Sequence, residues 1–241
     1  MTDEKRFDMS KKWRWLLPQL QQFIVWPFVR PALMFFAKFK VYGLENIKDL
    51  KGSVIFAPNH ASELDPILVP AAFPWFFRLS PVFYVVSADK TYRKDTDFKW
   101  RKHLYGGFFF RSWGAYPIVA GMKDYAKSMP HHERILEEGG SVCLFPEGRW
   151  SESGKHKTAR GGVAYLAEKT GAIIIPTSIG GTWHLKASDF FKRKLEISIS
   201  FGKPIYASDI INTEESEPEK YQTAAVKVMT DVKNNLAKLN E

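Results

Sequence analysis

The sequence has almost no cysteine, because Cys143 is the only one among 241 residues. An internal disulfide is therefore excluded. Cys143 lies in the apolar run Val142–Phe145, and such a run is typical of a buried strand. We therefore expect a small core residue at this position and not a reactive thiol.

The sequence also lacks the features of a signal peptide. It begins with polar and acidic residues, and no small-residue cleavage site follows the apolar region behind them. This absence predicts a location on the cytoplasmic side of the membrane.

A long uninterrupted apolar run is missing as well. The most apolar region extends from Trp13 to about Phe39, but three prolines interrupt it and Arg30 lies in its middle. A membrane-spanning helix needs about 20 mostly apolar residues. We therefore expect residues 1–39 to be a helical segment that lies in the membrane interface, with Trp13, Trp15 and Trp26 as contacts. The alternative is a pair of helices packed on the protein's own core.

Positive charge and aromatic residues are abundant instead. There are 35 Lys and Arg against 26 Asp and Glu, which gives a net charge of +9, and 15% of the residues are aromatic. This balance favours an anionic partner: nucleic acid, an anionic membrane surface or a phosphorylated substrate. The basic residues are spread over the chain without a nucleic-acid-binding motif, so we expect a peripheral or monotopic membrane protein and no nucleic acid.

From about Lys40 onward, short apolar runs alternate with helical segments, which is typical of an α/β domain. Strands are expected near 41–44, 54–57, 82–86, 116–119, 141–145, 172–175 and 195–199, and helices near 66–73, 123–138 and 214–239. Because no repeat or linker is visible, residues 40–241 should form one domain, a mixed, mostly parallel sheet flanked by helices. His131 and His132 are expected on its surface.

One short polar stretch stands between a predicted strand and a predicted helix. It reads Asn59-His60-Ala61-Ser62-Glu63-Leu64-Asp65-Pro66. A histidine has an ordinary pKa near 6.5 and can take a proton at neutral pH. A carboxylate on its other ring nitrogen fixes the tautomer and stabilises the imidazolium. His60 and Asp65 are therefore candidates for removing a proton from a hydroxyl.

Two other interpretations of this stretch stand beside the first. Asp65 before Pro66 is a good helix start, so Asp65 can simply cap a helix while Asn59 and Ser62 make turn hydrogen bonds. Alternatively, His60, Glu63 and Asp65 are all metal-ligand types.

A second polar motif, Phe145-Pro146-Glu147-Gly148-Arg149, follows another predicted strand. Its glycine allows the backbone to approach a ligand, and its arginine can bind phosphate in bidentate fashion. Glu147 can bind a substrate hydroxyl or hold the arginine. In an open α/β sheet, ligands bind outside the carboxyl ends of strands, so both motifs are expected to face one crevice.

These motifs resemble those of the glycerolipid acyltransferase family of the lysophosphatidic-acid acyltransferase type. Asn59-His60 with Asp65 is similar to its N-H-x-x-x-x-D motif, and Phe145–Gly148 to its F-P-E-G motif, in the same order. Ile175-Pro176 resembles its V-P motif, and Lys90 with the segment 114–118 loosely matches its intervening motif. The resemblance covers roughly residues 40–205.

The resemblance implies transfer of a fatty acyl group from acyl-CoA or acyl-carrier protein to a hydroxyl of a lysolipid in phospholipid biosynthesis. His60 would be the general base and Asp65 would orient it, and backbone N–H groups near Ala61 and Ser62 are candidate oxyanion donors. No acyl-enzyme, metal or bound cofactor is implied. The expected substrate contacts are Glu147, Gly148, Arg149, Asn59, Ser62, Arg111 and Lys90.

Two departures from the family pattern concern the acceptor. The intervening motif usually ends in I-x-R, where this chain has Ala120, and the F-P-E-G motif more often continues T-R-S, where this chain has Arg149-Trp150. Arg111, Lys155 or Arg160 can supply the missing charge. The favoured acceptor is 1-acylglycerol-3-phosphate.

Three alternative functions remain open at this point. The first is transfer to another amphiphile, such as a lysophospholipid, an acylated amino acid or a glycolipid. The others are a non-catalytic lipid-binding protein and a metal-dependent hydrolase that uses His60, Glu63 and Asp65.

Overall fold

A computed structural model describes residues 11–87, 107–118, 124–148 and 158–239. The described strands form a seven-stranded sheet in the order β1-β7-β6-β2-β5-β3-β4. All neighbouring strands run parallel except β6 and β7, which are antiparallel. The predicted mixed, mostly parallel sheet is therefore confirmed.

The elements have the following bounds. The strands are β1 (Lys40–Tyr42), β2 (Val54–Pro58), β3 (Val82–Ser87), β4 (Ala115–Ile118), β5 (Ser141–Cys143), β6 (Ile173–Gly180) and β7 (Ser198–Phe201). The helices are α1 (Lys11–Phe36), the 3-10 helix η2 (Leu44–Asn46), α2 (Asp65–Ala72), α4 (Gly107–Ser112), α5 (Tyr125–Ser128), α6 (Pro130–Glu137), α7 (Gly162–Thr170), α8 (Ala187–Phe191), α9 (Ala207–Ile210) and α10 (Glu219–Leu239).

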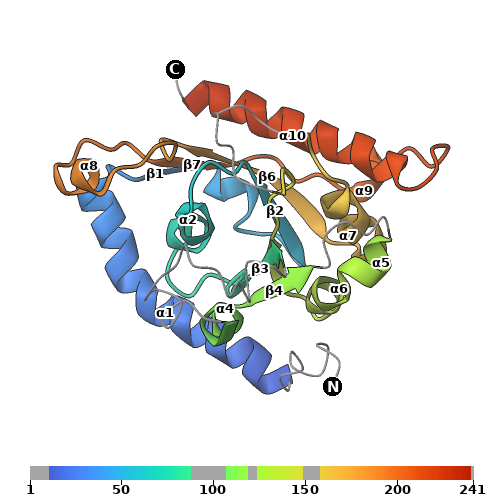
Figure 1. Ribbon diagram of the computed structural model, residues 1–241, viewed down its shortest axis with the longest axis horizontal. Coiled ribbons are helices and arrows are strands. Elements are labelled where there is room, and N and C mark those ends of the chain that lie inside the picture. The colour runs from blue at the N-terminus through green and yellow to red at the C-terminus, as the bar shows by residue number, and fades with distance from the viewer. Residues whose placement is uncertain (1–10, 88–106, 119–123, 149–157, 240–241) are drawn as a thin grey trace, which may run out of the picture.

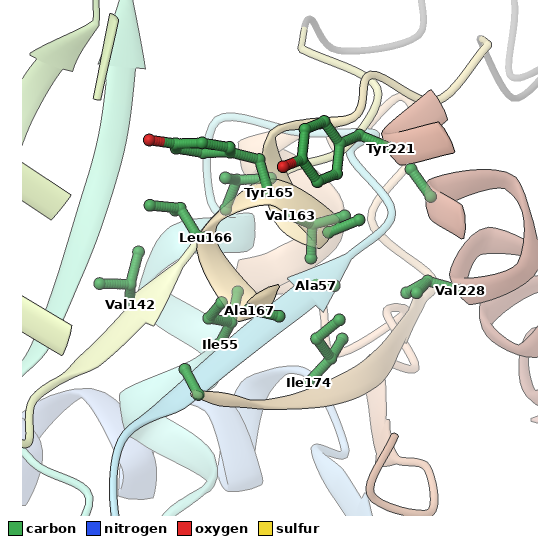
Figure 2. Close-up of a cluster of buried hydrophobic side chains, with 14 of the residues drawn as sticks. Ile55, Ala57, Val142, Val163, Tyr165, Leu166, Ala167, Ile174, Tyr221 and Val228 are labelled. Carbon is green, nitrogen blue, oxygen red and sulfur yellow. The ribbon is translucent and has the colours of Figure 1, made fainter. Parts of the chain in front are cut away.

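Helices cover both faces of the sheet (Figure 1). Alternate residues of each strand point to opposite faces. Ile55 and Ala57 of β2 face α7 and α10 and share one core cluster with them (Figure 2). Val54 and Phe56 face the other way, toward α1 and α2. The central strands are buried on both faces, which is why they appear in the sequence as continuous apolar runs.

Helix α1 runs unbroken through Pro18, Pro27 and Pro31. An interior proline usually costs a helix about 3 kcal/mol, so contacts with the rest of the molecule must compensate. The Gln22 side chain exchanges two hydrogen bonds with the backbone of Val82, at 2.8 and 2.9 Å. Nη1 of Arg30 donates to the carbonyls of Ala71, Ala72 and Phe73 at the end of α2.

Part of the predicted interface segment is used by the fold itself. Arg14 is buried and forms an ion pair with Glu138 at 2.8 Å. Trp15 donates its indole N–H to the same carboxylate and packs edge-on against Phe83. Trp13, by contrast, is exposed. Trp15 is therefore only partly exposed, and contact of the three tryptophans with a membrane stays a prediction.

Two predictions on the segment 123–138 are wrong. The expected helix over 123–138 is two helices, α5 and α6, which meet at Met129 because Pro130 starts a new helix. His132 is fully buried and not a surface residue. Its Nε2 lies 3.3 Å from the carbonyl oxygen of Tyr84, and burial lowers its pKa to about 4.

Candidate functional site

The two polar motifs meet at one edge of the sheet. β2 lies between β5 and β6 and is parallel to both, so the carboxyl ends of all three strands point to the same edge. His60 follows β2, and Glu147 follows β5. Oε1 of Glu147 lies 3.4 Å from the backbone nitrogen of His60, from which it accepts a hydrogen bond. The two motifs therefore lie side by side at this edge, and a crevice that both of them face stays a prediction.

His60 and Asp65 form a hydrogen-bonded pair. Nδ1 of His60 lies 2.9 Å from Oδ2 of Asp65, whose side chain is completely buried, whereas that of His60 is 16% exposed. The imidazole also stacks on the ring of Phe145, with centroids 4.1 Å apart. In the neutral tautomer that donates from Nδ1, Nε2 carries the lone pair. Within the described part of the chain, Nε2 has no hydrogen-bond partner, so it is the nitrogen available to accept a proton.

Asp65 holds the turn in front of it as well as the histidine. The same Oδ2 atom accepts hydrogen bonds from the backbone N–H groups of Ala61 at 2.7 Å and Ser62 at 2.8 Å. No side chain caps helix α2, so the interpretation of Asp65 as a helix cap is wrong. The expectation that these two N–H groups are free oxyanion donors is also wrong, because both already donate to the carboxylate.

The described residues give no support to a metal site in this turn. Among residues 11–87, 107–118, 124–148 and 158–239, no three His, Cys, Asp or Glu side chains are grouped so that they could hold a metal ion. Glu63 is exposed, and Nδ1 of His60 faces Asp65.

Asn59 and Ser62, which were expected to contact substrate, make hydrogen bonds within the protein. Nδ2 of Asn59 donates to the carbonyl of Ile179 at 2.9 Å, and Oδ1 accepts from the N–H of Ile179 at 2.8 Å. This pair continues the pairing of β2 with β6 beyond the strand end. Oγ of Ser62 accepts from the N–H of Leu64 at 3.2 Å. Both side chains therefore position the turn that carries His60.

The second motif folds as a tight turn after β5. Gly148 has φ +69°, a left-handed conformation that favours glycine, and its N–H donates to the carbonyl of Phe145 at 3.0 Å. Glu147 is buried, so its contact with His60 gives it a positioning role. Substrate contact by Glu147 or Gly148 stays a prediction.

The remaining predicted site residues are only partly placed. Lys90 and Arg149, together with Ala120 and Lys155, lie outside the described residues. Arg111 is partly exposed in α4. Arg160 lies beside the second motif, where its guanidinium group occupies the space next to Gly148. The sequence offered Arg160 only as one of three candidate charges.

An apolar cavity adjoins the turn that follows His60. Its volume is about 860 Å³, within the range of ligand pockets in proteins. Residues 61–64 form part of its wall, and Val29, Ala32 and Leu33 of α1 and Ile67 and Leu68 of α2 form another part. Residues 182–186, Phe190, Phe191 and Leu195 complete it. Sequence reasoning missed this cavity, because segments far apart in the chain line it.

Cys143 is a core residue, as predicted. It is fully buried in β5. Burial is the main cause that raises the pKa of its thiol, and the nearby Asp65 carboxylate raises it further. A thiol that stays protonated is a poor nucleophile, so Cys143 does not compete with His60 for a chemical role.

Large apolar side chains are exposed along α1 and in the loop after α2. Phe23 and Trp26 of α1 stack with Trp75, and Phe76 lies against Phe23. We call these four residues the aromatic ridge. Phe76 is 79% exposed and Trp75 is 49% exposed. In the described part of the chain, no helix combines the length and the apolar character that crossing a membrane requires.

Known proteins are similar to this chain in sequence and in fold. The chain is 22% identical over 180 residues to a chloroplastic 1-acyl-sn-glycerol-3-phosphate acyltransferase of Arabidopsis thaliana, which is 72% of this chain and 45% of that protein. It is also 22% identical to a chloroplastic 1-acyl-sn-glycerol-3-phosphate acyltransferase of Brassica napus, and the alignment covers 72% of this chain and 46% of that protein. The chain thus spans about half the length of these curated relatives.

The crystal structure of the 1-acyl-sn-glycerophosphate acyltransferase of Thermotoga maritima has the same fold. It aligns with a TM-score of 0.59 at 19% identity, over 92% of this chain and 79% of that one. The sequence profile of the Acyltransferase family matches residues 38–180, a range that contains both polar motifs. The chain therefore belongs to the Acyltransferase family.

Proposed function

We propose that this protein transfers a fatty acyl group from a thioester donor to the free hydroxyl of a lysolipid, with 1-acylglycerol-3-phosphate as the acceptor. The observation that carries this proposal is the His60–Asp65 pair, whose free Nε2 lies at the carboxyl edge of the sheet. The names of the relatives support the acceptor.

The reaction needs one base and no covalent enzyme intermediate. Nε2 of His60 takes the proton of the acceptor hydroxyl as its oxygen attacks the thioester carbonyl. The resulting tetrahedral intermediate collapses, the carbon–sulfur bond breaks, and the leaving thiolate takes the proton from Nε2. The products are an ester and a free thiol, so no further reactant is required.

In this reaction Asp65 orients the imidazole of His60 and stabilises its positive charge. Its carboxylate is buried, and three hydrogen bonds to Oδ2 hold it in place beside the imidazole. When His60 takes up the proton, the adjacent negative charge stabilises the imidazolium. Glu147, which follows β5, accepts a hydrogen bond from the backbone of His60, and Asn59 ties the residue before His60 to Ile179 of β6.

The cavity beside residues 61–64 is suited to a fatty acyl chain. Its walls are mostly apolar, and its contact with the catalytic turn brings the head of a bound chain close to His60. The aromatic ridge is suited to a lipid surface, because aromatic side chains settle at the membrane interface. We therefore propose peripheral attachment to a membrane through α1 and the loop after α2.

The test is a thiol-release assay with palmitoyl-CoA and a panel of lysolipids. We expect release that depends on lysophosphatidic acid, and a loss of at least about 10²–10⁴-fold in rate for His60→Ala. Asp65→Asn should lower the rate severely as well, because an amide neither carries the charge nor holds the tautomer.

Three results would change the assignment. Near-normal turnover by a folded His60→Ala variant would overturn the mechanism. His60-dependent release with an unphosphorylated acceptor would keep the mechanism and replace the acceptor. Abolition of release by a chelator would instead favour a metal-dependent hydrolase.

A further inference from the structure

Arg160 is held against the second motif by its backbone. Its N–H donates to the carbonyl of Pro146 at 2.8 Å. The next residue, Gly161, is held just as closely, because a Cβ atom there would lie 2.6 Å from Cβ of Tyr221 and 2.8 Å from the hydroxyl of Tyr125. The point from which the Arg160 side chain leaves the backbone is therefore fixed from two sides.

The side chain of Arg160 lies over Gly148. A Cβ atom on Gly148 would lie 2.9 Å from Nε of Arg160 and 3.1 Å from its Cδ. The glycine therefore has two consequences: it permits the left-handed turn, and it leaves room for a guanidinium group next to Glu147. Glu147 in turn contacts the backbone of His60.

Arg160 is exposed. Among the residues that the structure describes, its guanidinium group forms no ion pair. A cation that lacks an ionic partner among these residues and lies beside the motif that contacts His60 is suited to an anionic ligand group. The planar guanidinium can bind phosphate oxygens in bidentate fashion.

We propose that Arg160 binds a phosphate group of the substrates and thereby selects a phosphorylated one. This rests on the proposed function and adds a specificity-determining residue outside the two motifs. The phosphate of the lysolipid acceptor is one source, since it is attached to the carbon next to the one that bears the attacking hydroxyl. The phosphates of the CoA donor are the other source.

The experiment compares Arg160→Ala and Arg160→Lys with the wild type on two acceptors of equal chain length, lysophosphatidic acid and 1-monoacylglycerol. Hydrogen bonds to charged groups typically contribute enough for a loss of about 10- to 100-fold. We expect kcat/KM for lysophosphatidic acid to fall by that factor in Arg160→Ala, with the loss in KM. Arg160→Lys, which keeps the charge but not the fork, should recover part of it.

Two arms distinguish the sources of phosphate. If Arg160 binds the phosphate of the acceptor, the rate of Arg160→Ala with 1-monoacylglycerol stays within about twofold of the wild-type rate. The inhibition constant of glycerol 3-phosphate then rises by the same factor by which kcat/KM for lysophosphatidic acid falls. If the donor carries it, KM for palmitoyl-CoA rises with both acceptors. The proposal would be overturned if Arg160→Ala left kcat, KM and the inhibition constant unchanged with both acceptors and with palmitoyl-CoA. It would also be overturned if kcat fell equally with both acceptors while KM stayed unchanged.

Lys203→Ala is the matched control for loss of one positive charge. Lys203 is exposed and follows β7 beside the amino-terminal half of β6, away from the edge that carries His60. It should leave all constants unchanged. If the wild type itself shows no His60-dependent transfer, the proposed function fails. Phosphate binding by Arg160 is then tested separately, by comparing the shift in melting temperature that glycerol 3-phosphate causes in the wild type and in Arg160→Ala.

Discussion

At the scale of single residues, Oδ2 of Asp65 is the centre of the site. It accepts hydrogen bonds from Nδ1 of His60 and from the backbone of Ala61 and Ser62. Burying a carboxylate is unfavourable unless hydrogen bonds replace its lost water. The three donors supply that replacement, and they also fix which imidazole nitrogen faces the substrate. The chemistry and the local fold thus depend on the same atom.

Gly148 gives a prediction about both stability and specificity. Gly148→Ala forces a non-glycine residue into a left-handed conformation, which costs roughly 1–2 kcal/mol. Its methyl group also collides with the guanidinium of Arg160. We expect a lower free energy of unfolding in urea and, in addition, a higher KM for lysophosphatidic acid.

Gly171→Ala separates these two effects. Gly171 has nearly the same conformation, φ +70°, at the end of α7, but a Cβ atom there would meet nothing within 4 Å. This control should lose a similar amount of stability with no change in KM. If both variants raised KM equally, the effect would come from general destabilisation and not from Arg160.

Sequence reasoning predicted the His60–Asp65 pair but not the hydrogen bonds that support it. His60 and Asp65 were predictable because their spacing and their place after an apolar run are local features. The pairing of Asn59 with Ile179 was not, because it joins residues 120 positions apart. The N–H groups of Ala61 and Ser62 were assigned to the wrong ligand although they lie close to Asp65 in the sequence, because only the folded chain shows that the Asp65 side chain points back at them.

At the scale of elements, contacts with the rest of the molecule overrule local preference in several places. Helix α1 continues through three prolines because its side chains are tied to β3 and α2. Helix α7 was not predicted at all. It is buried on most of its surface, so it lacks the alternation of polar and apolar positions that indicates a helix. The strands β2 and β3 were predictable because both faces are covered and the runs are continuously apolar.

The buried histidine of α6 predicts how stability depends on pH. The pKa of His132 is about 4 in the folded protein, lowered chiefly by burial, against 6.5 in the unfolded chain. Below pH 6.5, His132 is therefore protonated in the unfolded chain but stays neutral in the folded protein until the pH approaches 4. Stability should fall as the pH drops from about 6.5 to 4, by roughly 3 kcal/mol from this residue.

Urea denaturation at several pH values between 4 and 7 measures this effect. The expected result is that His132→Gln has a flatter stability profile than the wild type in this window. His131→Gln is the control, since His131 is partly exposed, and its profile should follow that of the wild type. A difference between wild type and His132→Gln that did not vary with pH would contradict the prediction.

At the scale of the whole molecule, the two faces differ in what they expose. Helices α10 and α1 lie on opposite sides of the sheet (Figure 1). Helix α10 buries one stripe of apolar residues, whereas α1 and the loop after α2 carry the aromatic ridge. Deleting residues 1–39 is a poor test of membrane contact, because Leu33, Ala37 and Phe39 belong to the core. Substitutions on the exposed ridge leave that core intact.

We predict that Trp75→Ser with Phe76→Ser weakens binding to vesicles that contain anionic phospholipid. Burial of one large apolar side chain typically contributes about 1.5–3 kcal/mol, so the partition coefficient should fall by at least about tenfold. Sedimentation with liposomes measures it. Phe76→Ser alone, at the more exposed position, should show a smaller fall without loss of thermal stability.

Val226→Ser provides the control on the opposite face. Val226 is 48% exposed on α10, so its loss removes apolar surface of a comparable kind where no lipid contact is proposed. Equal binding by all these variants and the wild type would mean that the ridge does not contact lipid.

Helix α2 connects the turn that carries His60 with helix α1. Its first residue is Asp65, and the carbonyls at its last turn are bound by Arg30 of α1. Eight helical residues span about 12 Å. The helix is thus a spacer of set length between α1 and the imidazole of His60. In the proposed mechanism, it would hold a membrane surface that contacts α1 at a defined depth relative to the acceptor hydroxyl. In the proposed mechanism, a molecule whose hydroxyl lies at another depth would have to leave that surface to react, so the length of α2 would contribute to substrate selection.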